Sequence, residues 1–180
     1  LYVLIEVEGS DAERDSQLFD EVLADCLGQN NKQGGLLDAV VAQSHSEAEK
    51  FWQIRDGVIT ILSNIKQRAN FDVGVPISVM SEFVSRVEKK LFASVDHLQL
   101  CTFGHMADGN LHLLAWVDNG DDNSVSNDDV VQSIYQMVYE IVGAMQGTVT
   151  AEHGIGAMKR KYLYLCRSQE EITLMRTLKQ

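Results

Sequence analysis

The sequence is poor in proline, cysteine and positive charge. Its 180 residues include one proline and three cysteines, and 15 lysines and arginines stand against 26 aspartates and glutamates. Cys26, Cys101 and Cys166 are widely spaced without a C-x-x-C pair, which argues against a disulfide framework or a zinc ribbon and indicates reduced thiols. The net charge of −11 argues against nucleic acid and anionic membranes as partners. A small anionic substrate would therefore need local positive charge.

Long hydrophobic runs are also missing. No apolar stretch approaches the roughly 18 residues of a membrane span, and no signal-peptide pattern is present. We therefore expect a cytoplasmic protein, in a bacterial cytosol or the equivalent mitochondrial matrix. The chain starts in mid-strand with LYVLIEVEGS, so we expect a fragment of a longer protein. With 45% hydrophobic residues it can bury a core, and we expect a single domain over residues 1–180.

Short β-branched and aliphatic segments alternate with segments of helical period. The expected strands cover residues 2–7, 36–42, 72–77, 98–103 and 111–117. Apolar stripes predict helices over residues 19–26, 80–91 and 130–145, and two capping-box spacings, Ser44 with Glu47 and Ser168 with Glu171, mark helix starts. Because a hairpin in the series requires antiparallel pairing, we predict an α+β fold. The expected architecture is a ferredoxin-like sandwich, with a largely antiparallel sheet and helices packed on one face.

Two histidines flank an Asp-Gly pair in the apolar run TFGHMADGNLHLLAWV. A two-residue type I′ turn at Asp108 and Gly109 would place His105 directly opposite His112. Cβ atoms of opposed residues lie roughly 5 Å apart, so both imidazoles could reach one metal ion at about 2.0–2.1 Å. A lone histidine on an apolar face is more often a satisfied core residue. Two unpaired buried imidazoles would be costly neighbours, however, and this favours half of a metal site.

The segment TVTAEHGIGAMKRKYL has an extended start, then Glu152 and His153, a Gly-Ile-Gly turn and an expected helix over residues 158–163. A carboxylate oxygen would complete a set of three protein ligands with the two histidines. On spacing alone, an exposed strand-to-helix turn explains this pattern equally well. The basic run of residues 159–161 is by itself typical of a solvated helix face.

An arginine lies within an apolar helical stripe in EKFWQIRDGVITIL. Phe51, Val58 and Leu62 line that stripe, and the spacing places Arg55 among them. Two interpretations are open at this point. Arg55 forms an internal ion pair with an acidic residue, or it clamps a substrate carboxylate, which a guanidinium matches bidentately.

Together, GHMADGNLH, AEHGIGAMKRKYL and FWQIRD resemble the C-terminal domain of the FAD-linked oxidases. That family includes D-lactate dehydrogenase, the glycolate oxidase flavin subunit and D-2-hydroxyglutarate dehydrogenase. The resemblance covers nearly the whole chain. It implies that FAD is held mainly by a separate FAD-binding domain of the same full-length chain, whereas this domain holds the substrate. The residues that contact FAD are not identified, and we expect the 180-residue chain alone to be inactive.

The resemblance also implies a site. His105, His112 and Glu152 correspond to the ligands of a divalent metal, for which zinc is the expected ion. His153 corresponds to the catalytic base and contacts the substrate, as does Arg55. The implied reaction is oxidation of a D-2-hydroxy acid to the 2-oxo acid, with hydride transfer to FAD. The electron acceptor and a homodimeric state are left open.

Three residues depart from the hydroxyglutarate-type pattern of that family. Asn70, a further substrate-contact position, stands where lysine is usual, Leu114 replaces an asparagine and Ala107 replaces a glycine. The loss of a lysine and an amide favours a smaller or more apolar hydroxy acid over a dicarboxylate. The alternative interpretation of the whole chain is a non-catalytic metal-binding or structural α+β module.

Overall fold

The computed structural model describes residues 1–28, 36–118 and 128–179. The chain divides into two compact units, Leu1–Ser63 and Asn64–Gln180. Helices are combined with an antiparallel sheet, so the predicted α+β class is confirmed. Among the described residues, no helix combines the length and the apolar character needed to cross a membrane.

The N-terminal unit consists of two helices, α1 (Ala12–Gly28) and α2 (His45–Ser63). The strands expected over residues 2–7 and 36–42 are wrong, because neither segment belongs to a ladder among the described residues. A strand exists only through hydrogen bonds to a neighbour. Their β-branched composition indicates extended backbone, but it does not supply a partner.

Helix α2 follows its sequence signals closely. The Glu47 N–H donates to Ser44 Oγ (3.3 Å), and the Gln43 N–H donates to Glu47 Oε2 (2.8 Å), so this start is capped from both sides. Leu62 is buried in α2, and Arg55 and Val58 on the same stripe are half-buried. The predicted stripe that contains the arginine is therefore confirmed.

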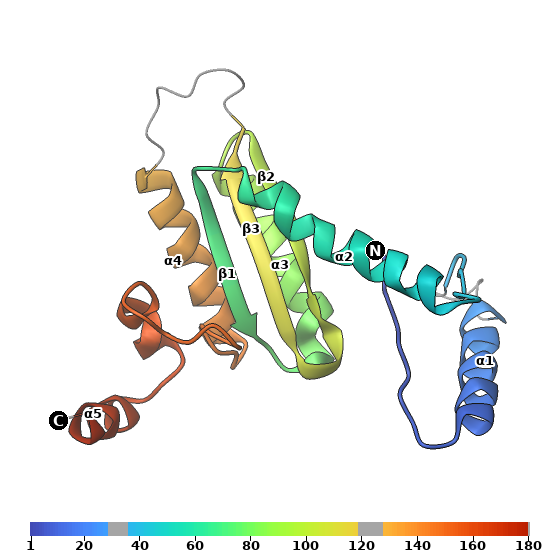
Figure 1. Ribbon diagram of the computed structural model, residues 1–180. Helices are drawn as coiled ribbons and strands as arrows, with labels where there is room; N and C mark the ends of the chain where they lie inside the picture. The colour runs from blue at the N-terminus through green and yellow to red at the C-terminus, as the bar shows by residue number, and fades with distance from the viewer. Residues whose placement is uncertain (29–35, 119–127, 180) are drawn as a thin grey trace. The chain divides into compact units, whose positions relative to one another are not determined.

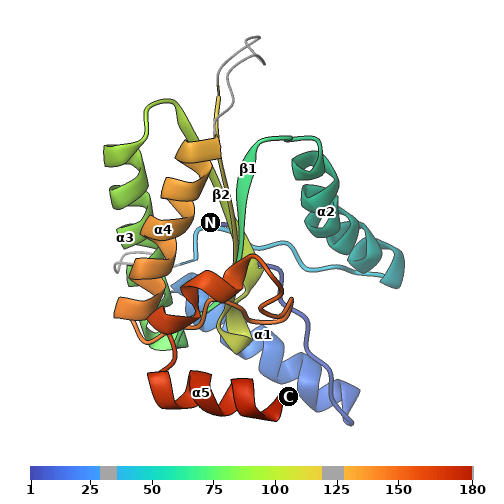
Figure 2. The same ribbon diagram turned by 90° about the vertical axis from the view of Figure 1, so that its left-hand side faces the viewer.

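The C-terminal unit is built on a three-stranded antiparallel sheet of order β1-β3-β2. Its strands are β1 (Arg68–Gly74), β2 (Leu98–His105) and β3 (Asn110–Val117). Helices α3 (Met80–Ser94) and α4 (Asp128–Ala144) cover one face (Figures 1 and 2). An isolated bridge between Gly74 and Thr148 follows α4, on the free side of β1. The order is therefore βαββα plus a rudimentary fourth strand, as in a ferredoxin-like sandwich.

The sheet separates an apolar face from a polar face, because successive side chains of a strand point to opposite sides. Phe71 and its cross-strand partner Leu113 are fully buried in the core shared with α3 and α4. The ring of Phe71 packs 4.9 Å from Tyr135 and 5.3 Å from Tyr139 of α4, measured between centroids. One position along β1, Asp72 points to the opposite face.

The hairpin between β2 and β3 differs from its prediction. His105 pairs with Asn110, and His112 pairs with Phe103, so the expected pairing of His105 with His112 is wrong. The turn is a 3₁₀ turn, Met106–Asp108, closed by Gly109 at φ 77°, instead of a two-residue type I′ turn. The longer loop shifts the register by two residues. An even shift leaves every side chain on its predicted face, so both histidines still share one side of the sheet.

The chain after the bridge to Thr148 ends in two further helical segments. The helix expected over residues 158–163 is a 3₁₀ helix, Lys159–Leu165. Helix α5 (Gln169–Leu178) begins with the complete predicted capping box of Ser168 and Glu171. Local signals at this end of the chain therefore identified both segments, but not the tighter winding of the first.

Gly109 should tolerate no side chain. Its φ of 77° is left-handed, and an added Cβ would lie 2.4 Å from the Val75 carbonyl oxygen. We expect Gly109→Ala to lower the free energy of unfolding by about 2–4 kcal/mol, the sum of backbone strain and crowding. Urea denaturation measures this change. Gly57→Ala is the control, because a Cβ at this α2 position meets no atom within 4 Å. An equal loss in both variants would contradict the prediction.

Candidate metal centre

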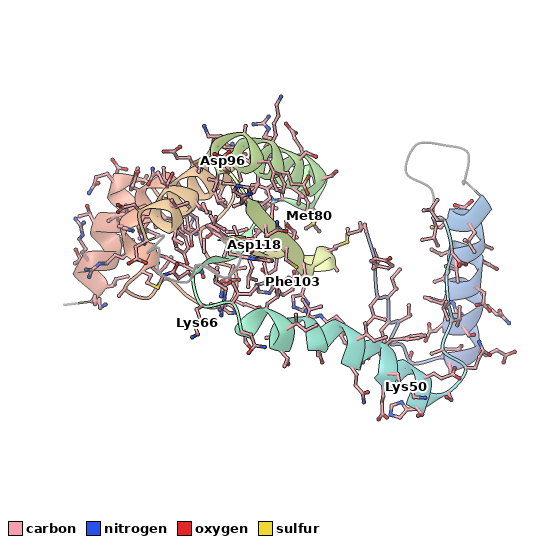
Figure 3. All side chains as sticks on the ribbon, turned by 90° about the horizontal axis from the view of Figure 1, so that it is seen from above. Lys50, Lys66, Met80, Asp96, Phe103 and Asp118 are labelled. Atoms are coloured by element: carbon pink, nitrogen blue, oxygen red, sulfur yellow. The ribbon has the colours of Figure 1, made fainter. Side chains whose placement is uncertain are left out.

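The site lies on the polar face of the sheet, where one row of side chains crosses the three strands. Asp72 of β1, His112 of β3 and Phe103 of β2 are direct cross-strand partners. Phe103, the member of this row on β2, is labelled in Figure 3. The His112 ring lies 5.2 Å from the Phe103 ring, between centroids, and both Asp72 and His112 are buried. A carboxylate and an imidazole are thus held side by side with little access to water.

The rudimentary fourth strand brings a second set of polar residues to this row. Gly74 and Thr148 exchange two backbone hydrogen bonds, of 3.1 and 2.8 Å, and these align the following residues with the end of β1. Glu152 and His153 come next, and Gly154, at φ 76°, turns the chain away. A left-handed residue directly after the pair explains why glycine stands there. The predicted strand end is reduced to the bridge at Thr148, and Glu152 and His153 lie in a bend four and five residues after it.

Asp72 is the residue that sequence reasoning missed. Its carboxylate accepts hydrogen bonds from the backbone N–H groups of Ala151 (3.1 Å), Glu152 (3.3 Å) and His153 (3.0 Å). The hydroxyl of Thr150 (3.0 Å) and the ammonium of Lys159 (3.1 Å) donate to it as well. The available signal was the position itself, since NFDVGV places an acid inside a buried β-branched run.

The surroundings of Asp72 stabilise its charged form. Burial alone would raise the pKa of this carboxyl. The backbone N–H groups of His153 and Glu152 and the ammonium of Lys159 outweigh burial, so the pKa of Asp72 lies well below its usual value of 3.8. Asp72 therefore carries a full negative charge at every physiological pH.

His112, Glu152 and His153 converge beside this carboxylate. His112 Nε2 lies 3.1 Å from Glu152 Oε1, and His153 Nε2 lies 3.6 Å from the same oxygen. The rings of His112 and His153 are stacked, with centroids 5.4 Å apart and an interplanar angle of 24°. Residues far apart in the sequence thus present two imidazoles and a carboxylate to one point.

The burial of His112 favours its neutral form. Burial lowers the pKa of His112, and the neighbouring His153 and His105 lower it further, although Glu152 and Asp72 act in the opposite direction. The net pKa is lowered. A neutral imidazole has a free nitrogen lone pair, which is what a metal ion requires of a histidine ligand.

His105 lies next to this cluster but is not part of its tightest group. Its ring centroid is 6.0 Å from that of His112, at 79°. This spacing follows from the corrected register, because the two histidines are diagonal neighbours on adjacent strands. The tightest group consists of four residues whose ligand atoms all lie within 4.8 Å of one another: Asp72, His112, Glu152 and His153.

The donor set fits a divalent cation with mixed nitrogen and oxygen ligands. Two ligands at about 2.1 Å from one tetrahedral or octahedral ion lie roughly 3.0–3.4 Å apart. The 3.1 Å between His112 Nε2 and Glu152 Oε1 falls in that range. Because Glu152 and His153 are exposed, the cluster is accessible from one side. A site that is covered by the sheet on one side and open to solvent on the other can hold an ion and leave coordination positions for a substrate.

The two predicted substrate contacts lie in different units. Asn70 is an exposed residue of β1, two positions before Asp72 and therefore on the same face of the sheet. Arg55 lies in α2 of the N-terminal unit, where its Nη1 pairs with Asp56 Oδ1 at 3.1 Å. Its approach to the site stays a prediction.

The whole chain matches the family described as FAD linked oxidases, C-terminal domain, over residues 1–180. A putative mitochondrial D-lactate dehydrogenase of Schizosaccharomyces pombe is 32% identical over 99% of this chain and 34% of its own length. A D-2-hydroxyglutarate dehydrogenase of Xanthomonas citri pv. viticola is 35% identical over 82% of this chain and 31% of its own length. A probable mitochondrial D-2-hydroxyglutarate dehydrogenase of Oryza sativa subsp. japonica is 30% identical over 99% of this chain. The chain spans about a third of the length of these curated relatives.

Asp72 should contribute stability in a pH-dependent way. Because its folded-state pKa lies below the usual 3.8, its contribution is complete above that pH and is lost as the pH falls through the folded value. We expect Asp72→Asn to lower the free energy of unfolding by roughly 2–4 kcal/mol at pH 7. The difference from the wild type should narrow as the pH falls below about 4. Urea denaturation at a series of pH values measures it, and a difference independent of pH would contradict the prediction.

Proposed function

Because this chain belongs to the family of C-terminal domains of FAD-linked oxidases, we propose that residues 1–180 form the substrate- and metal-binding domain of a flavin-dependent dehydrogenase. The proposed reaction is oxidation of a D-2-hydroxy acid to the 2-oxo acid. The observation that carries the proposal is the convergence of His112, Glu152 and His153 at the end of the sheet. The names of the relatives, which are D-lactate and D-2-hydroxyglutarate dehydrogenases, support the substrate class.

The proposed metal ligands are His105, His112 and Glu152. The distance of 3.1 Å between His112 Nε2 and Glu152 Oε1 supports two of them. His105, the proposed third ligand, lies on the neighbouring strand with its ring centroid 6.0 Å from that of His112. Two nitrogen ligands and one oxygen ligand with an open position favour zinc among the divalent ions. When bound, the cation would polarise the substrate hydroxyl, and FAD on the remainder of the enzyme would accept the hydride from Cα.

The chain's own residues supply proton transfer and orientation. His153, exposed beside Glu152, accepts the hydroxyl proton at Nε2 while the Cα–H bond breaks. Charge therefore does not accumulate on the alcohol carbon. Arg55 binds the substrate carboxylate with its guanidinium and fixes which face of Cα is presented. The local positive charge required by an anionic substrate on this acidic chain comes from that guanidinium and from the cation.

The residues beside His112 favour a smaller acid than hydroxyglutarate. Asn70 and Leu114, the two departures from the hydroxyglutarate-type pattern, are direct cross-strand partners on the same face as His112. Where that pattern has a lysine and an asparagine side by side, this chain has one amide and one buried aliphatic group. Neither side chain supplies a positive charge for a second carboxylate. A monocarboxylic 2-hydroxy acid such as lactate is therefore the proposed class.

Replacing a metal ligand should remove metal binding without unfolding the chain. We expect His112→Ala, His105→Ala and Glu152→Ala each to weaken zinc binding by more than about 100-fold, because each removes a coordinating atom. Competition with a chromophoric chelator measures the affinity. His97→Ala is the matched control, since His97 is an exposed histidine just before the opposite end of β2. A wild-type chain that takes up no zinc would overturn the metal site.

Substitutions of His153, the proposed base, and of Arg55, which is proposed to bind the substrate carboxylate, should change different steady-state constants of the flavin-loaded enzyme. We expect His153→Ala to reduce kcat by about 10²- to 10⁴-fold, the usual contribution of a general base. Arg55→Ala should mainly raise KM for the hydroxy acid, because its contact is made equally in the ground and transition states. Arg14→Ala, an exposed arginine of α1, is the control. Unchanged kcat in His153→Ala would remove the residue from the chemical step.

A further inference from the structure

The carboxylate of Asp72 and the ammonium of Lys159 form a buried ion pair at the end of β1. We propose that this pair is a positioning device: it holds the backbone of residues 150–153 so that Glu152 and His153 reach the site, and it binds neither the metal nor the substrate. This inference rests on the proposed function, because it assigns the device to the metal and base of that site.

The geometry ties two separate segments to one carboxylate of β1. Three consecutive backbone N–H groups, those of Ala151, Glu152 and His153, donate to Asp72 from the bend that follows the bridge at Thr148. Lys159, the first residue of the 3₁₀ helix, reaches back to Asp72 Oδ2 (3.1 Å) and to the Asp72 carbonyl oxygen (3.3 Å). Its ammonium also donates to Thr150 Oγ1 (3.2 Å). The two side chains that face the site therefore extend from a backbone fixed at every residue.

The hydrogen bonds also argue against Asp72 Oδ2 as a ligand atom, although Asp72 lies within the tightest group of candidate ligand residues. Oδ2 already accepts from Thr150 Oγ1, Ala151 N, His153 N and Lys159 Nζ, and Oδ1 accepts from Glu152 N. A carboxylate offers about four lone-pair sites on its two oxygens. A metal at Oδ2 would have to displace these donors and would stand beside the ammonium of Lys159.

The pair matters for the site because ligand placement is demanding. A metal site tolerates only small displacements of its ligands, and groups that orient them typically account for about 10- to 100-fold in affinity. Glu152 and His153 are exposed side chains on a short segment with one bridge to the sheet. Without the carboxylate beneath them, three adjacent N–H groups would turn to water, and the two side chains would lose their common direction.

Replacing Lys159 shows whether Asp72 positions the site or binds the metal, because the two roles predict opposite changes in zinc affinity. We expect Lys159→Met to weaken zinc binding of the purified chain about 10- to 100-fold, because the segment is released. If Asp72 were itself a ligand, the same variant would strengthen binding, since a competing cation would be gone. Lys161→Met is the matched control: it removes the same charge two residues away, from a lysine that contacts Gln132 and Tyr162. Its zinc affinity should stay near that of the wild type.

Two milder variants keep the test decisive if Lys159→Met does not fold. Thr150→Val is nearly isosteric and deletes the hydrogen bond to Asp72 together with the one that Thr150 Oγ1 accepts from Lys159, while the Asp72–Lys159 ion pair is kept. The chain should therefore fold and lose roughly fivefold in zinc affinity. Lys159→Arg retains the charge and should recover most of the affinity. The absorption spectrum of the Co²⁺-saturated chain should be unchanged in Thr150→Val and Lys159→Arg, because the ligands themselves are the same.

The outcomes separate this inference from the proposed function. A wild-type chain that binds no zinc or Co²⁺ overturns both. A wild-type chain that binds zinc, with unchanged or tighter binding in Lys159→Met and unchanged binding in Thr150→Val, overturns the positioning role alone. A Co²⁺ spectrum that changes in Thr150→Val would also overturn it, because the carboxylate would then belong to the coordination shell.

Discussion

A carboxylate without access to water must be surrounded by donors, and Asp72 is in that position. Its charge is compensated by three backbone N–H groups, a hydroxyl and an ammonium, all contributed by residues 150–159. Burial of an unpaired charge would cost several kcal/mol, so β1 can adopt its place in the sheet only if that later segment folds onto it. The place of β1 in the sheet and the assembly of the site therefore depend on the same contacts.

Because successive side chains of a strand point to opposite faces of the sheet, the residues of the apolar core and the residues of the site lie on different faces. On one face, Phe71 and Leu113 pack with α3 and α4 in a fully buried apolar core. On the other, Asp72 and His112 occupy the adjacent positions of the same two strands. A change of one residue in register would exchange these faces and place the charged groups in the core. The packing of the helices thus fixes the register, and the register fixes which side chains meet at the site.

The proposed site needs positive charge to bind an anionic substrate, although the chain as a whole is negatively charged. The net charge of −11 would repel a small acid, and two of the three residues of the basic run 159–161 are already engaged by other groups of the protein. Its first member, Lys159, is bound to Asp72, and Lys161 contacts Gln132 and the Tyr162 ring. The interpretation of the run as a solvated helix face is therefore wrong for Lys159. Attraction of an anionic substrate depends on Arg55 and on a bound cation in the proposed mechanism.

What the sequence by itself determined is local. Apolar periodicity located α1, α3 and α4, the capping spacings located the starts of α2 and α5, and motif spacing selected His112, Glu152 and His153. Each of these signals depends on residues a few positions apart. Only the tertiary structure decided that residues 2–7 and 36–42 form no strand, that the hairpin register is shifted by two, and that Asp72 lies beneath the site. These features depend on which distant segments pair. The free energy of such pairing comes from burial and from hydrogen bonds between residues up to 87 positions apart, which no local pattern records.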